Sequence, residues 1–306
     1  MDLERTANLP VTGVPTLTSS HQRIDEDDRM NPQTQHLVIG ATGKTGSRVL
    51  KGLRELGFAP KGASRNGDVA FDWDDPTTWI TALNGIDAVY LTYYPDLAVA
   101  KAPEDISKFC ALAKMKGVKH ITVLSGRAEP AAQVCENIIK QSGIGWTVIR
   151  ASWFNQNFSE GLFRQFVMDG KIALPVTDIT EPFVDIDDIA EIAIASLTEE
   201  KHIGQLYEVT GPDLISFGDI ADKFTRHLNR EIRFESISMD EFERRLNQSG
   251  VPQGVIEALV YLFGEVLDGR SESTTDGVER ALGRPATGFD EYIRRNRQFF
   301  ATAARA

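Results

Sequence analysis

Short apolar runs alternate with longer amphipathic stretches along most of the chain from residue 36 onward. The apolar runs predict strands at 36–40, 60–64, 69–71, 87–92, 120–125, 146–150 and 206–209. The stretches between them carry apolar residues at helical spacing, and the first of these helices is expected to end at Gly57. Apolar strands separated by amphipathic helices are typical of a parallel sheet covered on both faces. The pattern therefore predicts an α/β fold, a Rossmann-like doubly wound sheet whose ligand lies beyond the carboxyl ends of its strands.

The second half of the chain has a less regular pattern. We expect a helix from Asn155 to Met168, followed by the apolar segment KIALPV. A further helix is expected to be capped by Asp187 or Asp188, because a carboxylate at that place accepts hydrogen bonds from the free N–H groups of a first turn. The chain then reads as mostly helical, with a strand at 232–237. This part predicts a smaller lobe over the mouth of the sheet.

The patterns divide the chain into three parts. The first 33 residues are rich in Thr, Ser, Pro and charge without periodicity, which predicts a flexible tail, with Met30 as an alternative start. The remaining parts are a Rossmann domain over 34–158 and 182–211 and a substrate lobe over 159–181 and 212–302.

Charge and composition exclude several classes of function. The chain has 306 residues and a formal net charge of −11, so we do not expect it to bind nucleic acid or an anionic membrane surface. No apolar run reaches the roughly 18 residues of a membrane helix, and no signal-peptide core is present. A cytoplasmic protein that acts on a small molecule is expected, whereas the oligomeric state stays open.

The chain offers no pattern for a disulfide framework or a metal site. Its two cysteines, Cys110 and Cys135, both lie in predicted helices, and no Cys/His group has zinc spacing. Two buried thiols in a reducing compartment are expected. The acidic run from Asp25 to Asp28 is interpreted as part of a solvated tail.

The stretch LVIGATGKTG, residues 37–46, predicts a phosphate-binding turn, because glycines and a helix N-terminus follow a strand directly. A triphosphate-binding loop would need its first glycine where Val38 lies inside the strand, so that interpretation fails. The spacing Gly40-x-x-Gly43-x-x-Gly46 instead favours a dinucleotide. Gly40 would allow the tight turn, Gly43 the approach of the pyrophosphate, and Gly46 close packing of the helix on the strand.

The end of the second strand favours NADP(H) over NAD(H). An acid there would bind the adenosine ribose, but the sequence GASRNGD places Arg65 at this point. A guanidinium pairs with a 2′-phosphate in forked geometry, and Lys44 would add a second positive charge. The alternative for Arg65 is an ordinary solvated loop arginine.

Five motifs resemble the NmrA-like branch of the atypical short-chain dehydrogenase/reductases over residues 36 to 300. They are GATGKTG, the strand-end Arg65, VLSGR, SGIGWTVIRASWFNQNF and PFVDIDDIA. Within this branch, RASWFNQNFSEG and YLFGEVLDGR most resemble a bacterial group similar to the ergot-alkaloid (festuclavine and agroclavine) dehydrogenases. Those enzymes reduce a cyclic iminium with NADPH, so the resemblance implies an NADPH-dependent reductase.

The resemblance also implies which residues bind the cofactor and the substrate. The adenine half of NADP would be held by Gly40, Thr42, Gly43, Lys44, Thr45, Gly46 and Arg65, with Asp72 beside adenine. The nicotinamide half would be lined by Thr92, Tyr93 and Ser125. The substrate pocket would be formed by Trp153, Phe154 and Asn157, with Tyr261 and Phe263 entering from the lobe. Tyr94 joins Tyr93, Trp153 and Tyr261 as an aromatic face for a substrate cation, with core packing as the alternative for each of these rings.

The sequence departs from ordinary short-chain dehydrogenases, which carry Tyr-x-x-x-Lys on the helix after the fifth strand. Here that helix reads PAAQVCENIIKQSG, with Lys140 but no tyrosine. Hydride addition to a ketone needs an acid or strong hydrogen-bond donors, whereas hydride addition to an iminium leaves a neutral amine. The absence favours iminium or quinone-like substrates, and no catalytic residue is assigned. It fits equally well a non-catalytic NADP(H)-binding redox sensor of the NmrA type.

Overall fold

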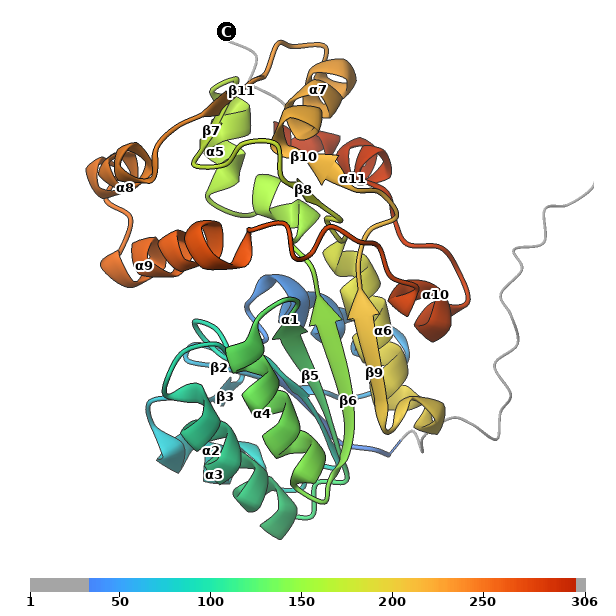
Figure 1. The fold of residues 1–306 in the computed structure, drawn as a ribbon. Helices are drawn as coiled ribbons and strands as arrows, with labels where there is room; N and C mark the ends of the chain where they lie inside the picture. Colours follow the sequence, from blue (N-terminus) through green and yellow to red (C-terminus); the bar gives the residue numbers. More distant parts are fainter. Residues whose placement is uncertain (1–32, 301–306) are drawn as a thin grey trace, which may run out of the picture.

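The computed structural model describes residues 33–300, so Met30, the acidic run Asp25–Asp28 and most of the expected tail lie outside the described residues. Its centre is a parallel sheet of seven strands in the order β3-β2-β1-β4-β5-β6-β9 (Figure 1). The strands are β1 (His36–Ile39), β2 (Lys61–Ser64), β3 (Val69–Ala70), β4 (Ala88–Leu91), β5 (His120–Gly126), β6 (Gly145–Ala151) and β9 (Gln205–Val209). All seven predicted strands are present, and the predicted doubly wound α/β fold is confirmed.

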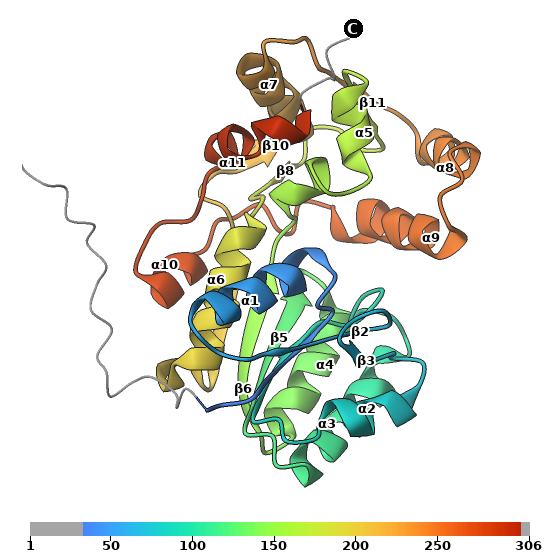
Figure 2. The same cartoon turned by 180° about the vertical axis from the view of Figure 1, so that it is seen from behind.

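Helices cover both faces of this sheet. One face packs against α2 (Pro76–Ala82), α3 (Ala102–Met115) and α4 (Pro130–Gln141). The other face packs against α1 (Lys44–Glu55) and α6 (Ile186–Thr198), which lie in front of the sheet in Figure 2. Side chains of successive strand residues point to opposite faces, so Leu37 and Ile39 join the first core and Val38 joins the second.

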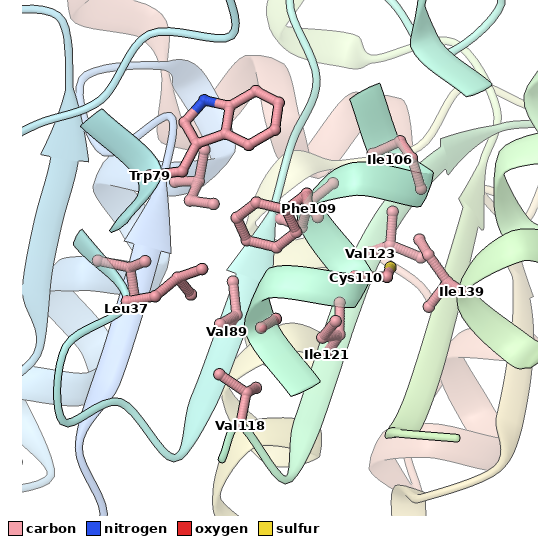
Figure 3. Packing of buried hydrophobic residues seen from close by; sticks show 14 of the residues in the cluster. Leu37, Trp79, Val89, Ile106, Phe109, Cys110, Val118, Ile121, Val123 and Ile139 are labelled. Carbon is pink, nitrogen blue, oxygen red and sulfur yellow. The ribbon is translucent and has the colours of Figure 1, made fainter. Parts of the chain in front are cut away.

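Aromatic rings fill the core between the sheet and α3. Trp79 and Phe109 lie above Val89 of the sheet, and apolar side chains of α3 and β5 lie beside Phe109 (Figure 3). The buried indole N–H of Trp79 donates to the backbone oxygen of Asp72 at 2.7 Å, which satisfies its one polar group. Cys110 and Cys135 are buried free thiols in α3 and α4, as the sequence predicted.

A second body of short elements lies over the carboxyl ends of the strands, toward which the arrowheads of β5 and β6 point in Figure 1. Its strands form two pairs: β7 (Lys171–Leu174) with β11 (Arg233–Ser236), and β8 (Thr180–Glu181) with β10 (Ile215–Ser216). Its helices are α5 (Phe163–Met168), α7 (Phe217–Leu228), α8 (Met239–Gln248), α9 (Gln253–Tyr261) and α11 (Phe289–Arg295), with a π-turn at Leu262–Val266 after α9. Two short segments pack on the sheet side instead: α10 (Gly277–Leu282) contacts α6 and β9, and a 3₁₀ turn at Glu200–His202 follows α6. The second body ends in a 3₁₀ turn at Arg297–Phe300. We call this body the lobe; its core is rich in phenylalanine.

The expected single helix from Asn155 to Met168 is wrong. The structure has a 3₁₀ turn at Asn155–Phe158 and then a separate α5 from Phe163. A Cβ on Gly161 would lie 3.0 Å from the backbone oxygen of Asn157, so the chain changes direction where a side chain would be crowded. Glycine inside a helix also costs about 1 kcal/mol relative to alanine, which favours this break.

The expected cap of α6 is also wrong by two or three positions. Asp185, rather than Asp187 or Asp188, precedes the helix and accepts from the N–H of Asp187 at 2.9 Å. The two expected residues have tertiary partners instead: Asp187 binds Arg48, and Asp188 binds Arg284. A run of three nearby carboxylates offered no local signal to tell the cap from the ion-pair partners.

The packing of α1 on β1 generates a stability prediction. A Cβ on Gly46 would lie 2.2 Å from the backbone oxygen of Gly40, and neither backbone segment has room to move without disturbing the turn. We expect Gly46→Ala to lower the free energy of unfolding by about 1–3 kcal/mol. Gly254→Ala is the matched control, because no atom lies within 4 Å of its added Cβ and its φ is negative. Urea unfolding followed by circular dichroism measures both; equal stabilities of the two variants would contradict the close approach.

Candidate functional site

The turn between β1 and α1 is a cradle of backbone N–H groups. Gly40 has φ +76°, a left-handed conformation that favours glycine, and its added Cβ would lie 2.2 Å from Thr92 Oγ1. Gly43 precedes α1 in extended conformation, and no side chain caps that helix. The N–H groups of the first turn are therefore available to an anion at the positive end of the helix dipole.

The side chains of the turn divide into exposed and buried ones. Thr42 and Gly43 are exposed, whereas Thr45 is buried with its side chain against Tyr90. Thr45 thus has only its backbone to offer a ligand. The geometry of the turn fits a pyrophosphate: two glycines leave the backbone uncovered, and Gly46 brings the helix N-terminus close to the strand.

Arg65 and Tyr94 meet beside this turn. Arg65 follows β2 and Tyr94 follows β4, and the guanidinium carbon lies 5.1 Å from the centre of the tyrosine ring. Both side chains are exposed, and among residues 33–300 no carboxylate forms a salt bridge with Arg65. The guanidinium is therefore held in place by a ring face while its N–H groups stay available. Asp72, beyond β3, accepts from the N–H of Asp74.

A cavity of about 390 Å³ lies between the carboxyl ends of β4, β5 and β6 and the lobe. Seven of the predicted site residues line it: Lys44, Thr92, Tyr93, Ser125, Trp153, Phe154 and Asn157. The lobe side is formed by the turn before α5 and by α9, through residues that include Gly161, Leu162, Val255 and Leu259. The cavity thus joins residues that are more than 200 positions apart in the sequence.

The other predicted site residues lie outside this lining. Tyr94 is 63% exposed beside Arg65, and Tyr261 is 39% exposed at the end of α9. Phe263 is buried in the lobe core, where its ring centre lies 5.2 Å from that of Trp153. Phe263 therefore packs against the ring of Trp153 and does not itself face the cavity.

Lys44 is directed into the cavity. Its amino group donates to Asn157 Oδ1 at 2.8 Å, which ties the glycine turn to the segment after β6. Burial lowers the pKa of Lys44, and the negative charge of Glu160 opposes that change. The position beside Asn157 gives the cavity one positive charge at its sheet side.

Ser125 is oriented by a buried ion pair. Its hydroxyl donates to Glu136 Oε1 at 2.8 Å, and Arg150 donates to both oxygens of the same carboxylate, at 3.0 and 2.6 Å. Burial alone would raise the pKa of Glu136, but the bonds from Arg150 and Ser125 hold it below its usual value. Since the proton of Ser125 is used by Glu136, its oxygen is left to accept a hydrogen bond from a ligand.

Tyr93 presents a ring rather than a hydroxyl to the cavity. Its hydroxyl donates to Asp105 Oδ2 at 2.7 Å, inside α3. Burial and then the neighbouring Asp105 raise the pKa of Tyr93 well above its usual range. The phenol therefore stays protonated and turned away, which makes it an apolar wall of the cavity.

Three acidic residues and an arginine of the lining were missed by sequence reasoning: Asp96, Glu129, Glu181 and Arg127. Glu129 and Glu181 are 6% and 2% exposed. Burial raises the pKa of Glu181 to about 7, and the Ser152 hydroxyl, which donates to it at 3.1 Å, opposes that rise. Glu129 and Glu181 each stand directly before a proline, and Asp96 directly follows one, outside the quoted motifs. Arg127 ends the motif VLSGR, but sequence reasoning assigned it no role in the site.

A family model describes more than half of the chain. The model of the NmrA-like family matches residues 129–293. The chain belongs to the NmrA-like family. The resemblance to this family, predicted from the motifs, is thereby confirmed.

Several proteins are similar in sequence to this chain over most of its length. Prestalk A differentiation protein A of Dictyostelium discoideum is 28% identical, over 84% of this chain and 91% of its own length. NAD(P)H azoreductase of Xenophilus azovorans is 26% identical, over 87% and 99%. Agroclavine dehydrogenase of Claviceps fusiformis is 25% identical, over 85% and 96%.

Solved structures share the fold of this family member. A nucleoside-diphosphate-sugar epimerase of Staphylococcus aureus has a TM-score of 0.74 at 17% identity and covers 86% of this chain and 100% of its own. The quinone oxidoreductase QOR2 of Escherichia coli, complexed with NADPH, has a TM-score of 0.72 at 20% identity, over 86% and 99%. Triphenylmethane reductase of Citrobacter sp., complexed with NADP(H), has 0.71 at 18%, over 86% and 99%. At these identities the likeness shows the fold alone.

Neither a metal centre nor a membrane-spanning helix is found in the described part of the chain. Among residues 33–300, no group of three or more His, Cys, Asp or Glu side chains is placed to hold a metal ion. Within the same residues, no helix combines the length and apolar character that crossing a membrane requires.

The buried pair of Glu136 and Arg150 generates a second stability prediction. Glu136→Gln removes a carboxylate that is 0% exposed and leaves the charge of Arg150 uncompensated at this contact, so we expect a loss of about 3–5 kcal/mol in unfolding free energy at neutral pH. Because the pKa of Glu136 is lowered on folding, this contribution is present above the unfolded pKa and is lost as the pH falls through the folded value. The difference between variant and wild type should therefore shrink below about pH 4.

Urea unfolding at several pH values measures this difference. Glu104→Gln is the matched control, because Glu104 is exposed and forms its salt bridge with Lys108 on the same helix. We expect the control to change stability by less than about 0.5 kcal/mol. A loss in Glu136→Gln that does not depend on pH would speak against the carboxylate as its origin.

Proposed function

We propose that this NmrA-like protein is an NADP(H)-dependent oxidoreductase that reduces a small cyclic imine, iminium or quinone-like compound by hydride transfer. The observation that carries the proposal is the cavity of about 390 Å³ between the ends of β4–β6 and the lobe, next to the glycine turn. Doubly wound sheets bind ligands at this edge, and a cavity of this size accepts a small ring system beside a nicotinamide.

The cofactor residues follow from the geometry of the cradle. The backbone from Gly40 to Gly46 would hold the pyrophosphate, and the uncovered guanidinium of Arg65 would pair with the 2′-phosphate. Thr92 and Ser125 would border the nicotinamide half, with the oxygen of Ser125 accepting from its carboxamide. When bound, NADPH supplies the hydride, and the chain contributes position and exclusion of water.

The two bodies of the structure would then have separate roles, one in cofactor binding and one in substrate binding. Residues 34–158 and 182–211 would hold the nucleotide, and residues 159–181 and 212–302 would form the substrate lobe. The lobe supplies Leu162, Leu259 and Leu262 to the cavity, so it would select the substrate and exclude water. Substitutions in the lobe would change which substrate is bound without changing how the cofactor is bound.

An aromatic, partly cationic substrate fits the lining best. Trp153, Phe154 and Tyr93 contribute rings, which favour flat or positively charged ligands. The names of similar proteins support this class, since they include an azoreductase and an agroclavine dehydrogenase. The absence of Tyr-x-x-x-Lys, a tyrosine followed by lysine four positions later, agrees with substrates other than simple alcohols and ketones: none of the six tyrosines has a lysine there.

The proposed reaction is tested by following NADPH oxidation with a panel of quinones, cyclic imines and N-alkylated cyclic iminium ions. We expect turnover with at least one class and much slower oxidation of NADH. If the protein binds NADPH but oxidises it with none of these compounds, the redox-sensor alternative replaces the reductase. If it binds neither nucleotide, the cofactor assignment fails as well.

The role of Arg65 predicts a change in cofactor preference. Arg65→Ala removes the guanidinium proposed for the 2′-phosphate, and a charged hydrogen bond of this kind contributes about 1.5–3 kcal/mol. We therefore expect the Kd for NADPH to rise about 10- to 100-fold while the Kd for NADH stays nearly constant. Arg54→Ala is the control, since Arg54 is exposed and pairs with Asp68. Calorimetric titration that gives equal losses for both nucleotides would remove Arg65 from the 2′-phosphate site.

A further inference from the structure

Two carboxyl groups face each other at the wall of the cavity. Glu129 is 6% exposed, and its Oε2 is buried without a hydrogen-bond donor among the described residues. Asp96, from the segment between β4 and α3, also lines the cavity and lies within hydrogen-bonding contact of the Glu129 side chain. Two carboxylates have no proton to share, so this contact becomes a hydrogen bond only when one of them is protonated.

The surroundings of the pair favour the protonated form. Burial raises the pKa of Glu129, and the negative charge of Asp96 raises it further. Tyr261 from α9 and Cys135 from α4 are the other titratable groups that face the pair, and neither brings a positive charge. No salt bridge within residues 33–300 involves Glu129 or Asp96, since Lys44 binds Asn157 and Arg127 binds Glu208.

The backbone of β5 holds the Glu129 carboxyl group close to the proposed nicotinamide site. A Cβ on Gly126 would lie 2.1 Å from Glu129 Oε1, so the carboxyl group lies against the last residue of the strand, next to Ser125. Glu129 also precedes α4 without capping it, because no side chain accepts from the first turn of that helix. Its side chain is therefore free to turn toward the cavity.

Glu181, the other buried acid of the lining, differs from Glu129 in its partners. Ser152 donates to the Glu181 carboxylate, and the positive charge of Arg127 further opposes the rise of its pKa. These contacts favour the charged form of Glu181. No side chain within residues 33–300 donates to Glu129, so Glu129 keeps its proton to a higher pH than Glu181 does.

We propose that Glu129, paired with Asp96, donates a proton to the oxygen or nitrogen of a neutral substrate, such as a quinone, as the substrate carbon framework accepts a hydride. The inference rests on the proposed reductase function. The O–H bond of Glu129 breaks, a bond forms between its proton and the substrate oxygen or nitrogen, and the electron pair stays on Glu129 as a carboxylate. NADPH becomes NADP⁺, and water reprotonates Glu129 afterwards.

This assignment adds neutral compounds to the iminium ions as substrates. The missing tyrosine on α4 favours iminium ions and compounds that solvent protonates, because the sequence shows no group that would donate a proton to the substrate. A carboxyl group at the beginning of the same helix supplies that donor from another position. Neutral quinones and imines then become direct substrates, and Asp96 is a positioning residue that keeps the proton on Glu129.

The first test compares a neutral quinone with an N-methylated cyclic iminium, which becomes a neutral amine without a proton. For Glu129→Gln we expect kcat with the quinone to fall by roughly 10²- to 10⁴-fold, whereas kcat with the iminium stays nearly the same. Glu257→Gln, an exposed change on α9, is the matched control and should alter neither. NADPH affinity, measured by titration, should stay constant in both variants. An equal fall with both substrates, or no fall with the quinone, overturns the proposal.

A second measurement needs no turnover. Infrared spectra of the cofactor-free protein should contain a protonated carboxyl band near neutral pH that is lost in Glu129→Gln and retained in Glu257→Gln. Glu181→Gln separates the contribution of the other buried acid. An unchanged band in Glu129→Gln would overturn the assignment even if the reductase function holds. If the band is lost in Glu129→Gln but the wild type does not oxidise NADPH with any substrate, the reductase function is wrong. Glu129 and Asp96 are then a protonated pair without a catalytic role.

The pH profile tests the pairing with Asp96. Reduction of the quinone needs protonated Glu129, so its rate should fall as the pH rises through the pKa of that group. Asp96→Asn removes the neighbouring negative charge, which lowers the pKa of Glu129. The midpoint of the pH-dependent fall in rate should therefore shift to a lower pH by about 1 unit or more. Asparagine keeps an oxygen to accept from the N–H of Ala98, as Asp96 does at 2.7 Å. If the pH–rate profile of Asp96→Asn has the same midpoint as that of the wild type, Asp96 does not affect the pKa of Glu129.

Discussion

The close contact between the first helix and the first strand is the constraint on which the site depends. Gly46 places the start of α1 within van der Waals distance of the Gly40 carbonyl, and Gly40 itself leaves no room for a Cβ beside Thr92. The backbone of α1 therefore meets the backbone of the turn, and the Thr92 side chain after β4 meets Gly40, at the point where the sheet order reverses between β1 and β4. This contact directs the helix N-terminus and the uncovered turn toward the edge where the cavity lies.

The lobe turns that edge into an enclosed environment. Residues after β6 and from α9 close over the strand ends, and Lys44 of the turn donates a hydrogen bond to Asn157 in the segment after β6. Enclosure removes water from Glu129, Glu181 and Lys44, and each of their pKa values moves toward the neutral form of the group. The same packing that shapes a pocket for a ring therefore also prepares groups that hold or release protons.

The helix after β5 illustrates how a chain of this family can keep a scaffold and change its chemistry. Glu136 and Lys140 lie one turn apart on α4, but Glu136 is committed to Arg150 and to the hydroxyl of Ser125, and it is fully buried. That carboxylate orients Ser125 and has no proton to give. The proposed acid, Glu129, comes from the beginning of the same helix, where the side chain reaches the cavity without entering the core.

The sequence by itself determined the strand order along the chain, the glycine turn and the family, because these are local: apolar periodicity, glycine spacing and contiguous motifs need no partner to be recognised. Through the resemblance to the family it also named seven residues that line the cavity. The tertiary structure decided what depends on distant neighbours. It broke the helix at Gly161, moved the cap to Asp185, placed Phe263 behind Trp153, and joined Glu129 to Asp96 across 33 positions of chain. From the sequence alone, an isolated acidic residue is expected to be exposed to solvent and charged. Burial and the charge of a nearby residue can change its protonation, and only the folded chain specifies which residue lies nearby.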